Sequence, residues 1–187
     1  MRVIAGKFGS RRLRTLRGLA LRPSSDRLRE TLFNILGAEV EDSLFVDAFA
    51  GTGAVGIEAL SRGAREVVFI ENHRPAANLI RENLHSLEIT TGADILPMDA
   101  IRGFAQLAAR RLLTDFIFLD PPYAQTSDYF DVLNFLDGLR LLAPRGLVIV
   151  EHRRKLELPG RLQKLEVSRV VEQGDSALTF YRLALAA

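Results

Sequence analysis

The sequence predicts an α/β fold: a Rossmann-like, mostly parallel sheet that ends in an antiparallel hairpin. Three observations carry this prediction. Continuous apolar segments typical of buried parallel strands alternate with amphipathic helical segments along most of the 187 residues. The chain ends on two strand-like segments around the Gly174-Asp175 turn, with no helix between them. A glycine-rich segment, DAFAGTGAVGIEAL at 47–60, follows the first long apolar segment, where an open α/β sheet binds its ligand.

The N-terminal elements differ from the rest. Two short strands, 3–5 and 11–16, are joined by a glycine-containing turn and form a small β-ribbon. A helix follows over 23–37, because a serine can cap it, leucines recur at helical spacing and a glycine ends it. We therefore divide the chain into an N-terminal basic ribbon plus helix, 1–40, which packs on a main domain, 41–187.

The main domain is predicted from apolar strands and amphipathic helices in alternation, with helices on both faces of the sheet. Five parallel strands are expected at 44–49, 66–71, 93–99, 115–120 and 146–151. The helices between them are expected at 54–62, 75–87, 100–113 and 129–142. The terminal hairpin occupies 162–185.

Charge is distributed unevenly along the chain. Residues 1–30 hold nine basic residues, eight of them Arg, against two acidic ones, a balance of +7, whereas the whole chain is +2. Such a basic arm indicates a polyanion partner, and arginine favours phosphate; a solvated surface is the alternative. The chain has no cysteine, which excludes disulfides and thiolate sites and favours a cytoplasmic protein. No apolar run approaches the roughly 20 residues that span a membrane.

The glycine-rich loop fits two adenosine cofactors. Gly51, Gly53 and Gly56 spell G-x-G-x-x-G, and Glu71 follows 20 positions after Gly51, where a carboxylate binds ribose hydroxyls. These residues are equally suited to bind NAD or S-adenosylmethionine. Asp47 favours S-adenosylmethionine, because a carboxylate is unfavourable beside a pyrophosphate and favourable beside an ammonium and a sulfonium. Its alternative role is to accept hydrogen bonds from backbone N–H groups of the loop.

The segment LDPPY, 119–123, follows the fourth predicted parallel strand and also favours S-adenosylmethionine. A methyltransferase acting on an exocyclic amine needs such a segment, and a dehydrogenase does not. Asp120 can accept one amine N–H, and a carbonyl of Pro121 or Pro122 can accept the other, with the prolines stiffening the backbone. Tyr123 offers a ring on which a base stacks, worth about 1–3 kcal/mol. A plain strand-terminating turn is the alternative.

The sequence resembles, nearly end to end, the RsmD family, bacterial methyltransferases of guanine N2 in 16S ribosomal RNA. The similar segments are MRVIAGKFGSRRL, LRPSSDRLRETLFNIL, DAFAGTGAVGIEALSRGA, LDPPY and GDSALTFYR. It departs from the family at the serine of GKFGSRRL, commonly glycine, and in EQGDSALTFY, which lacks the usual aromatic before its glycine. The resemblance implies a seven-stranded class I methyltransferase sheet and S-adenosylmethionine as donor. It also implies a flipped-out guanine of the small ribosomal subunit, or of its assembly intermediate, as target. We expect a monomer.

Matching positions carry over the site residues that the resemblance implies. Among them, Glu71 would bind the ribose, and Asp99 with the Ala100 N–H would face the adenine. The predicted donor-binding residues are Asp47, Ala50, Gly51, Gly53, Glu71, Asn72, Asp99, Ala100 and Asp120. The predicted catalytic and guanine-binding residues are Asp120, Pro121, Pro122 and Tyr123.

RNA contacts are predicted from the basic positions of the ribbon and the first helix: Lys7, Arg11, Arg12, Arg14, Arg22, Arg27 and Arg29. The segment HRRK, 152–155, offers a second contact, with a solvated loop as the alternative. No metal site is predicted, because His73, His85 and His152 share no ligand spacing. Two other function classes remain: an NAD-dependent oxidoreductase and a non-catalytic RNA-binding or assembly factor. Within the methyltransferases, a DNA adenine or cytosine amino-methylase shares D-P-P-Y.

Overall fold

The computed structural model describes residues 1–15, 23–122 and 126–185. Its strands are β1 (Leu44–Ala48), β2 (Glu66–Ile70), β3 (Ala93–Leu96), β4 (Thr114–Leu119), β5 (Leu142–Arg153), β6 (Leu165–Gln173) and β7 (Ser176–Leu183). Its helices are α1 (Pro23–Leu36), the short 3-10 helix η1 (Gly37–Val40), α2 (Ala54–Ser61), α3 (Arg74–Ser86), α4 (Ala100–Ala109) and α5 (Thr126–Gly138).

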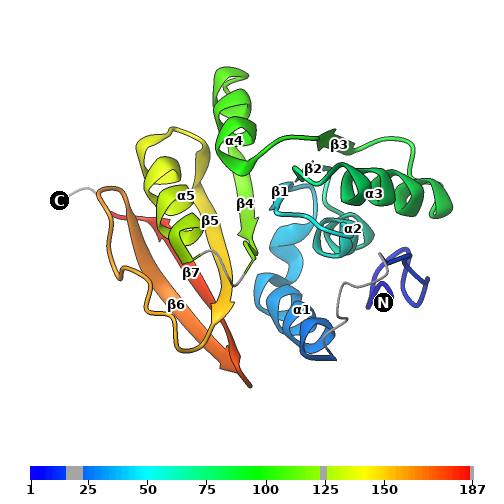
Figure 1. Cartoon of the computed structure of the whole chain (residues 1–187), viewed down its shortest axis with the longest axis horizontal. Helices are drawn as coiled ribbons and strands as arrows, with labels where there is room; N and C mark the ends of the chain where they lie inside the picture. The colour runs from blue at the N-terminus through cyan, green and yellow to red at the C-terminus, as the bar shows by residue number, and fades with distance from the viewer. Residues whose placement is uncertain (16–22, 123–125, 186–187) are drawn as a thin grey trace.

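The strands form one seven-stranded sheet in the order β3-β2-β1-β4-β5-β7-β6 (Figure 1). Strands β1 to β5 are parallel, and β7 runs antiparallel to both β5 and β6. The predicted sheet with its C-terminal hairpin is confirmed. Element ends differ by a few residues: β3 stops before Pro97, which has no N–H for the ladder, and β5 begins at Leu142 instead of the predicted Gly146.

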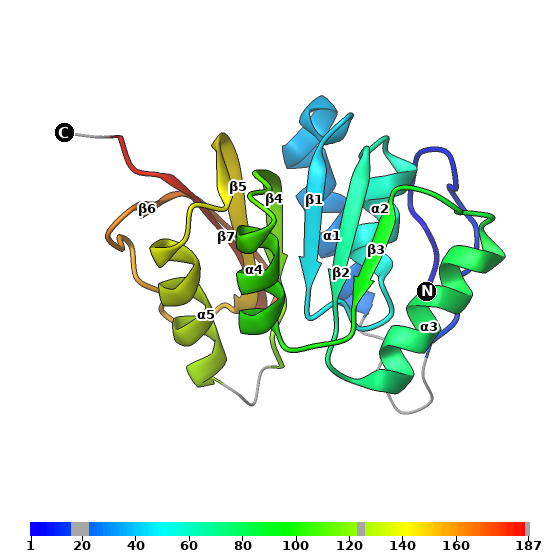
Figure 2. The same ribbon diagram turned by 90° about the horizontal axis from the view of Figure 1, so that it is seen from above.

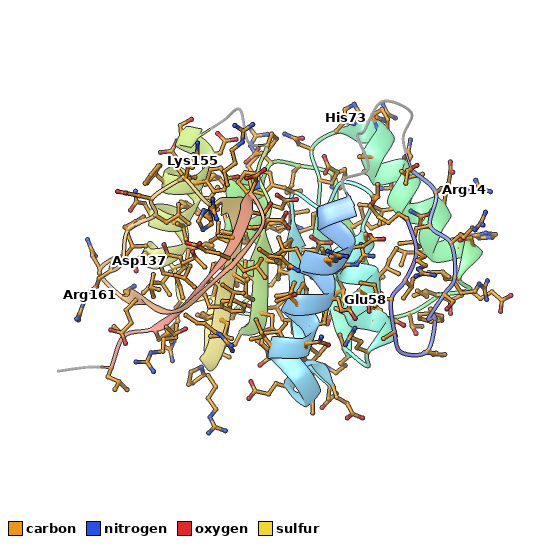
Figure 3. All side chains as sticks on the ribbon, turned by 90° about the horizontal axis from the view of Figure 1, so that it is seen from below. Arg14, Glu58, His73, Asp137, Lys155 and Arg161 are labelled. Carbon is orange, nitrogen blue, oxygen red and sulfur yellow. The ribbon has the colours of Figure 1, made fainter. Side chains whose placement is uncertain are left out.

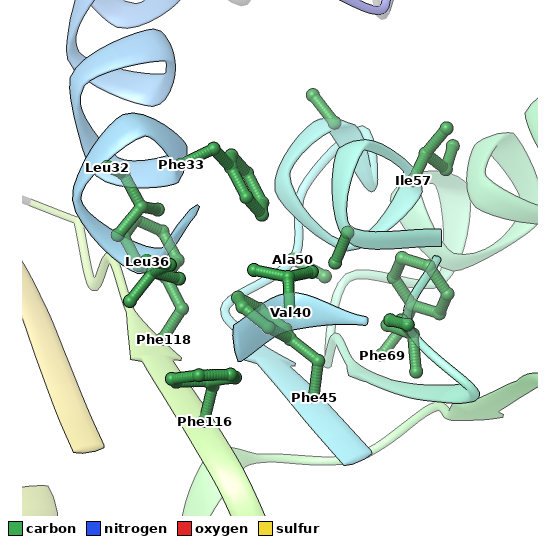
Figure 4. Close-up of a cluster of buried hydrophobic side chains, with 14 of the residues drawn as sticks. Leu32, Phe33, Leu36, Val40, Phe45, Ala50, Ile57, Phe69, Phe116 and Phe118 are labelled. Carbon is green, nitrogen blue, oxygen red and sulfur yellow. The ribbon is translucent and has the colours of Figure 1, made fainter. Parts of the chain in front are cut away.

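Helices cover both faces of the sheet. Successive strand residues point to opposite faces, and in the central strands both sets are apolar and must be buried. Phe45 and Phe116 point into one hydrophobic cluster with α1, α2 and α3 (Figure 4). Their neighbours Val46 and Ile117 point into the other cluster, under α4 and α5 (Figure 2). Both faces of the central strands are therefore apolar, as the continuous apolar segments predict.

The order of the strands reverses between β1 and β4, which are hydrogen-bonded neighbours. We call the side of the sheet where β1 to β5 end the carboxyl edge. The loops that follow β1, β2, β3 and β4 all leave from this edge. An open α/β sheet binds its ligands at such an edge, next to the switch in strand order.

In the described part of the N-terminal ribbon the two predicted strands are not formed: residues 1–15 make an antiparallel hairpin with one isolated β-bridge, between Arg2 and Arg12. Its arms carry Val3 and Leu13 into the same hydrophobic cluster as Phe45, so the ribbon shares a core with the sheet. The division of the chain at residue 40 stays a prediction. None of the helices in the described part of the chain combines the length and apolarity needed to cross a membrane.

Candidate active site

The loop after β1 turns back sharply at the carboxyl edge. Phe49, Gly51 and Gly53 have positive φ values of 62°, 56° and 76°, and the Gly53 N–H donates to the Ala50 carbonyl at 2.7 Å. Glycine adopts this left-handed conformation at no steric cost. A Cβ on Gly51 would have the Phe49 carbonyl oxygen, at 3.9 Å, as its nearest neighbour. The loop therefore leaves room for a ligand to approach its backbone.

The third glycine of the motif has a packing role. A Cβ on Gly56 would lie 2.3 Å from a ring carbon of Phe69 on β2. Its absence lets α2 lie close against the sheet, as the third glycine of such loops does. The sequence motif therefore combines two functions, ligand approach at its start and helix packing at its end.

Asp47 on β1 is buried beneath the loop, at 2% exposure. Its Oδ2 accepts the Gly56 N–H at 2.8 Å, so the alternative role, accepting hydrogen bonds from backbone N–H groups, is observed for one such group, which lies in the first turn of α2. Burial raises the pKa of Asp47 from 3.8 to about 8, against the opposing effect of the Gly56 hydrogen bond. A cationic ligand close to Asp47 would offset this burial and favour the ionised carboxylate.

Glu71, directly after β2, ties two loops of the carboxyl edge together. Its Oε2 accepts the Gly51 N–H and its Oε1 accepts the His73 N–H, both at 2.7 Å. Each carboxylate oxygen has a further lone pair, so ribose hydroxyls can still donate to Glu71. The neighbouring Asn72 is exposed. The structure thus brings Glu71 to the glycine loop, as the sequence spacing predicts.

Asp99, after β3, caps the N-terminus of α4. Its Oδ1 accepts the Arg102 N–H at 2.9 Å, and its Oδ2 lies 3.5 Å from the Arg102 Nε. Its side chain remains 47% exposed, and Ala100, the first residue of α4, is buried. A capping carboxylate is fixed in orientation. The adenine contact expected of this residue stays a prediction.

The D-P-P segment leaves β4 beside the glycine loop, because β4 is the direct neighbour of β1. Asp120 is half-buried, Pro121 is buried and Pro122 is exposed. The Pro121 carbonyl accepts the hydroxyl hydrogen of Tyr129, on α5, at 3.1 Å. Tyr123 lies outside the described residues, so its predicted stacking role stays a prediction. Sequence analysis assigns no role to Tyr129, although the sequence shows an aromatic residue at the start of the predicted helix after this loop.

The basic side chains of the ribbon are exposed, but some already have partners within the protein. Arg11 donates to the Ser86 carbonyl at 2.9 Å. Arg14, which Figure 3 labels, forms an exposed ion pair with Glu82, also at 2.9 Å. The Lys7 ammonium lies 5.3 Å from the centre of the Phe8 ring. Arg12 and Arg27 are exposed, and Arg22 lies outside the described residues.

The ribbon turn is fixed near the end of α2. The Lys7 N–H donates to the Ser61 carbonyl at 2.7 Å, and Ser61 is the last residue of that helix. Since α2 starts at the glycine loop, this turn lies a helix length away from the carboxyl edge. Lys7 therefore contacts RNA only if the bound RNA extends along this side of the protein.

The prediction that Arg29 contacts RNA is wrong. This side chain is 5% exposed and donates to the Arg2 carbonyl at 2.7 Å and to Asp26 at 3.2 Å. Its Nε also lies 4.0 Å from the fully buried carboxylate of Glu58. Burial lowers the pKa of Arg29, and these carboxylates oppose that effect. The residue anchors the ribbon to α1 and α2 because its partners lie inside the protein.

Two buried polar side chains that the sequence analysis missed join the ribbon to the site. Glu58 on α2 accepts the N–H groups of Ile4 and Ala5 at 2.7 and 3.0 Å. Asn83 on α3 donates to the Thr52 carbonyl of the glycine loop at 3.0 Å and exchanges hydrogen bonds with the Arg14 backbone. A carboxylate in the apolar stretch AVGIEALS was an available signal for Glu58; Asn83 had none.

The segment HRRK divides into an inner and an outer part. His152 is buried, and its Nε2 lies 2.8 Å from the Thr179 hydroxyl; burial lowers its pKa. Arg154 and Lys155 are exposed and directly follow β5. Lys155 and His73 lie on the same side of the protein, at the carboxyl edge (Figure 3). Within the described residues, no group of three or more His, Asp or Glu side chains could hold a metal ion.

Comparisons of the sequence with known proteins identify a family and relatives whose names include methyltransferases. The sequence model of the family "Conserved hypothetical protein 95" matches residues 1–182. "Putative rRNA methyltransferase YlbH" of Bacillus subtilis is 34% identical and covers 97% of this chain and 98% of its own. Ribosomal RNA small subunit methyltransferase D of Escherichia coli K12 is 32% identical, with coverages of 97% and 89%.

Comparison with solved structures also identifies methyltransferases as similar proteins. "Putative methyltransferase yhhF" from Escherichia coli has a TM-score of 0.86 at 32% identity, and covers 100% of this chain and 99% of its own. SMU.776, solved as a complex with SAH, shares the fold at a TM-score of 0.71 and 15% identity, over 87% of this chain and 50% of its own. The chain therefore belongs to the family of conserved hypothetical protein 95, the RsmD family, whose fold is that of class I methyltransferases and whose methyl donor is S-adenosylmethionine.

Proposed function

We propose that this protein methylates the exocyclic N2 amine of a guanine in 16S ribosomal RNA, within the small ribosomal subunit or its assembly intermediate, in the cytoplasm. The observation that carries the proposal is the D-P-P segment at the end of β4, next to the glycine loop after β1. The names of the relatives support the RNA substrate, since one is a ribosomal RNA small subunit methyltransferase matched over most of its length.

The residues of the carboxyl edge fit S-adenosylmethionine in their chemistry. When bound, the donor supplies a methyl group on a positively charged sulfur. Burial raises the pKa of Asp47 to about 8, so a cationic ligand close by would favour its ionised form, and Glu71 has lone pairs left for ribose hydroxyls. Backbone of Ala50, Gly51 and Gly53 would lie along the donor. Asn72, Asp99 and Ala100 complete the proposed adenosine side of the site.

The acceptor amine is proposed to lie against the D-P-P segment. Asp120 accepts one N–H and a proline carbonyl accepts the other, so that the nitrogen lone pair is directed at the methyl group. The guanine leaves its stack to reach this position, with Tyr123 as the stacking platform. The proton lost from the amine passes to Asp120 or to water.

The RNA surface is proposed to include the exposed basic residues on two sides of the site. On one side stand Lys7, Arg11, Arg12 and Arg14 of the ribbon, with Lys7 and Arg11 hydrogen-bonded to the last residues of α2 and α3, and Arg27 on α1. Arg22 belongs to the same stretch of sequence. On the other side, Arg154 and Lys155 follow β5, which is the neighbour of β4. Clustered arginines favour phosphate oxygens because of their forked geometry.

Methylation of small ribosomal subunits from a strain that lacks the enzyme tests the proposal. The purified protein, labelled S-adenosylmethionine and these subunits should give label at N2 of a single guanine of 16S ribosomal RNA, located by mapping the modified base. Label on adenine or cytosine amines of DNA would instead indicate a DNA amino-methylase. Binding to the subunits without label would indicate a non-catalytic assembly factor.

A further inference from the structure

The D-P-P segment is connected to α5 through a buried hydroxyl. Tyr129 is 2% exposed, and its O–H donates to the Pro121 carbonyl at 3.1 Å. We propose that Tyr129 is a positioning residue for methyl transfer: its hydroxyl fixes the Pro121 carbonyl and, through it, the direction of Asp120. This inference rests on the proposed function of the D-P-P segment.

The segment needs such an external partner because of its composition. Pro121 and Pro122 both lack an N–H, so two consecutive residues offer no backbone donor to the surrounding structure. Their rings restrict φ but leave ψ to be set by other contacts. The hydrogen bond from Tyr129 supplies one of these contacts at the residue next to Asp120.

The hydrogen bond is compatible with a direct role of the same carbonyl. A carbonyl oxygen has two lone pairs, and Tyr129 uses one of them. The other can accept an N–H of the substrate amine. Because Tyr129 itself is buried in the cluster with Val132 and Leu133, it acts on the amine through Pro121 and not by contact.

A second tyrosine provides a matched control. Tyr181 on β7 is also buried in the cluster with Val132, and its O–H donates to another proline carbonyl, that of Pro159, at 2.9 Å. A buried tyrosine hydroxyl commonly finds a partner of this kind. Pro159 lies outside the loops that follow β1 to β4, and its neighbour Gly160 accepts the Val167 N–H near the start of β6 at 2.9 Å. Tyr129→Phe and Tyr181→Phe therefore remove the same type of bond at different distances from the D-P-P segment.

The experiment measures single-turnover methylation of small ribosomal subunits at saturating donor, together with the affinity for S-adenosylmethionine. The parent protein comes first, since its failure to methylate would refute the proposed function. Tyr129→Phe should lower the transfer rate by about 10- to 100-fold, the scale of a misplaced reacting group, with donor affinity unchanged. Tyr181→Phe should stay within about twofold of the parent in both quantities. A parent-like rate in Tyr129→Phe, or an equal fall in Tyr181→Phe, would overturn the inference.

A spectroscopic readout checks the hydrogen bond without any methylation. In protein labelled with ¹³C at proline carbonyls, Tyr129→Phe should move the Pro121 resonance and leave that of Pro159 in place. Tyr181→Phe should do the reverse. An unchanged Pro121 resonance in Tyr129→Phe would contradict the proposed contact, whatever the activity.

Discussion

Replacing Glu58 by Ala should detach the N-terminal ribbon and destabilise the whole protein. The carboxylate is fully buried and accepts the Ile4 N–H, the Ala5 N–H and the Arg62 Nε–H, at 2.7, 3.0 and 2.8 Å. Each buried donor left without a partner costs about 1–3 kcal/mol, and breaking a buried ion pair costs about 3–5 kcal/mol. We expect the free energy of unfolding to fall by about 3–5 kcal/mol, since these costs overlap.

Thermal unfolding measures this effect. For a chain of this size, about 2–4 °C accompanies each kcal/mol, so Tm should fall by about 6–20 °C. Trypsin should also cleave faster after Lys7, because the ribbon turn loses its anchor. Glu82→Ala is the matched control: its ion pair with Arg14 is exposed, and its loss should cost less than about 1 kcal/mol. A Tm for Glu58→Ala no lower than that of Glu82→Ala would show that Glu58 does not anchor the ribbon.

Three further predictions follow from the site and its surroundings. Burial raises the pKa of Asp47 from 3.8 to about 8. The stability that its neutral form contributes is therefore complete below about pH 4 and is lost as pH rises through about 8. Asp47→Asn should remove this pH dependence from Tm values recorded between about pH 5 and pH 9. Gly56→Ala should lower the free energy of unfolding by about 1–3 kcal/mol in denaturant titrations, because the added Cβ would lie 2.3 Å from the Phe69 ring. Gly138→Ala is the control and should cause no such loss, since a Cβ at Gly138 would have no other atom within 4 Å. Equal losses in the two variants would contradict the packing role of Gly56. Replacing Arg11 and Arg12 together by Ala should reduce the salt slope of RNA binding by about one to two units and leave donor affinity unchanged; a parent-like slope would remove them from the RNA surface.

The sequence predicts the sheet and the loops of the carboxyl edge because both depend on local patterns. Apolar runs between amphipathic helices specify buried parallel strands, and glycines at fixed spacing specify the turn after β1. Glu71 is also predictable, since the length of a strand–helix–strand unit fixes its distance from Gly51. Its hydrogen bond to the Gly51 N–H confirms this proximity.

The residues that sequence analysis misplaced or missed depend on contacts between distant parts of the chain. Arg29 looks like the other arginines of the basic arm, and its burial follows from the positions of Arg2 and Glu58. Asn83 lies 69 positions from Arg14, with which it exchanges hydrogen bonds. A charge or an amide in the sequence does not show which partner the fold will bring to it.

The role of the D-P-P segment in holding the acceptor amine is tested most directly by the effect of Asp120→Ala on methyl transfer to small ribosomal subunits. We expect this variant to bind S-adenosylmethionine as the parent does and to lose at least about 100-fold in transfer rate, because the amine loses the acceptor that orients it. A variant that binds the donor normally and retains most of the parent's rate would contradict the assignment of the amine to the D-P-P segment.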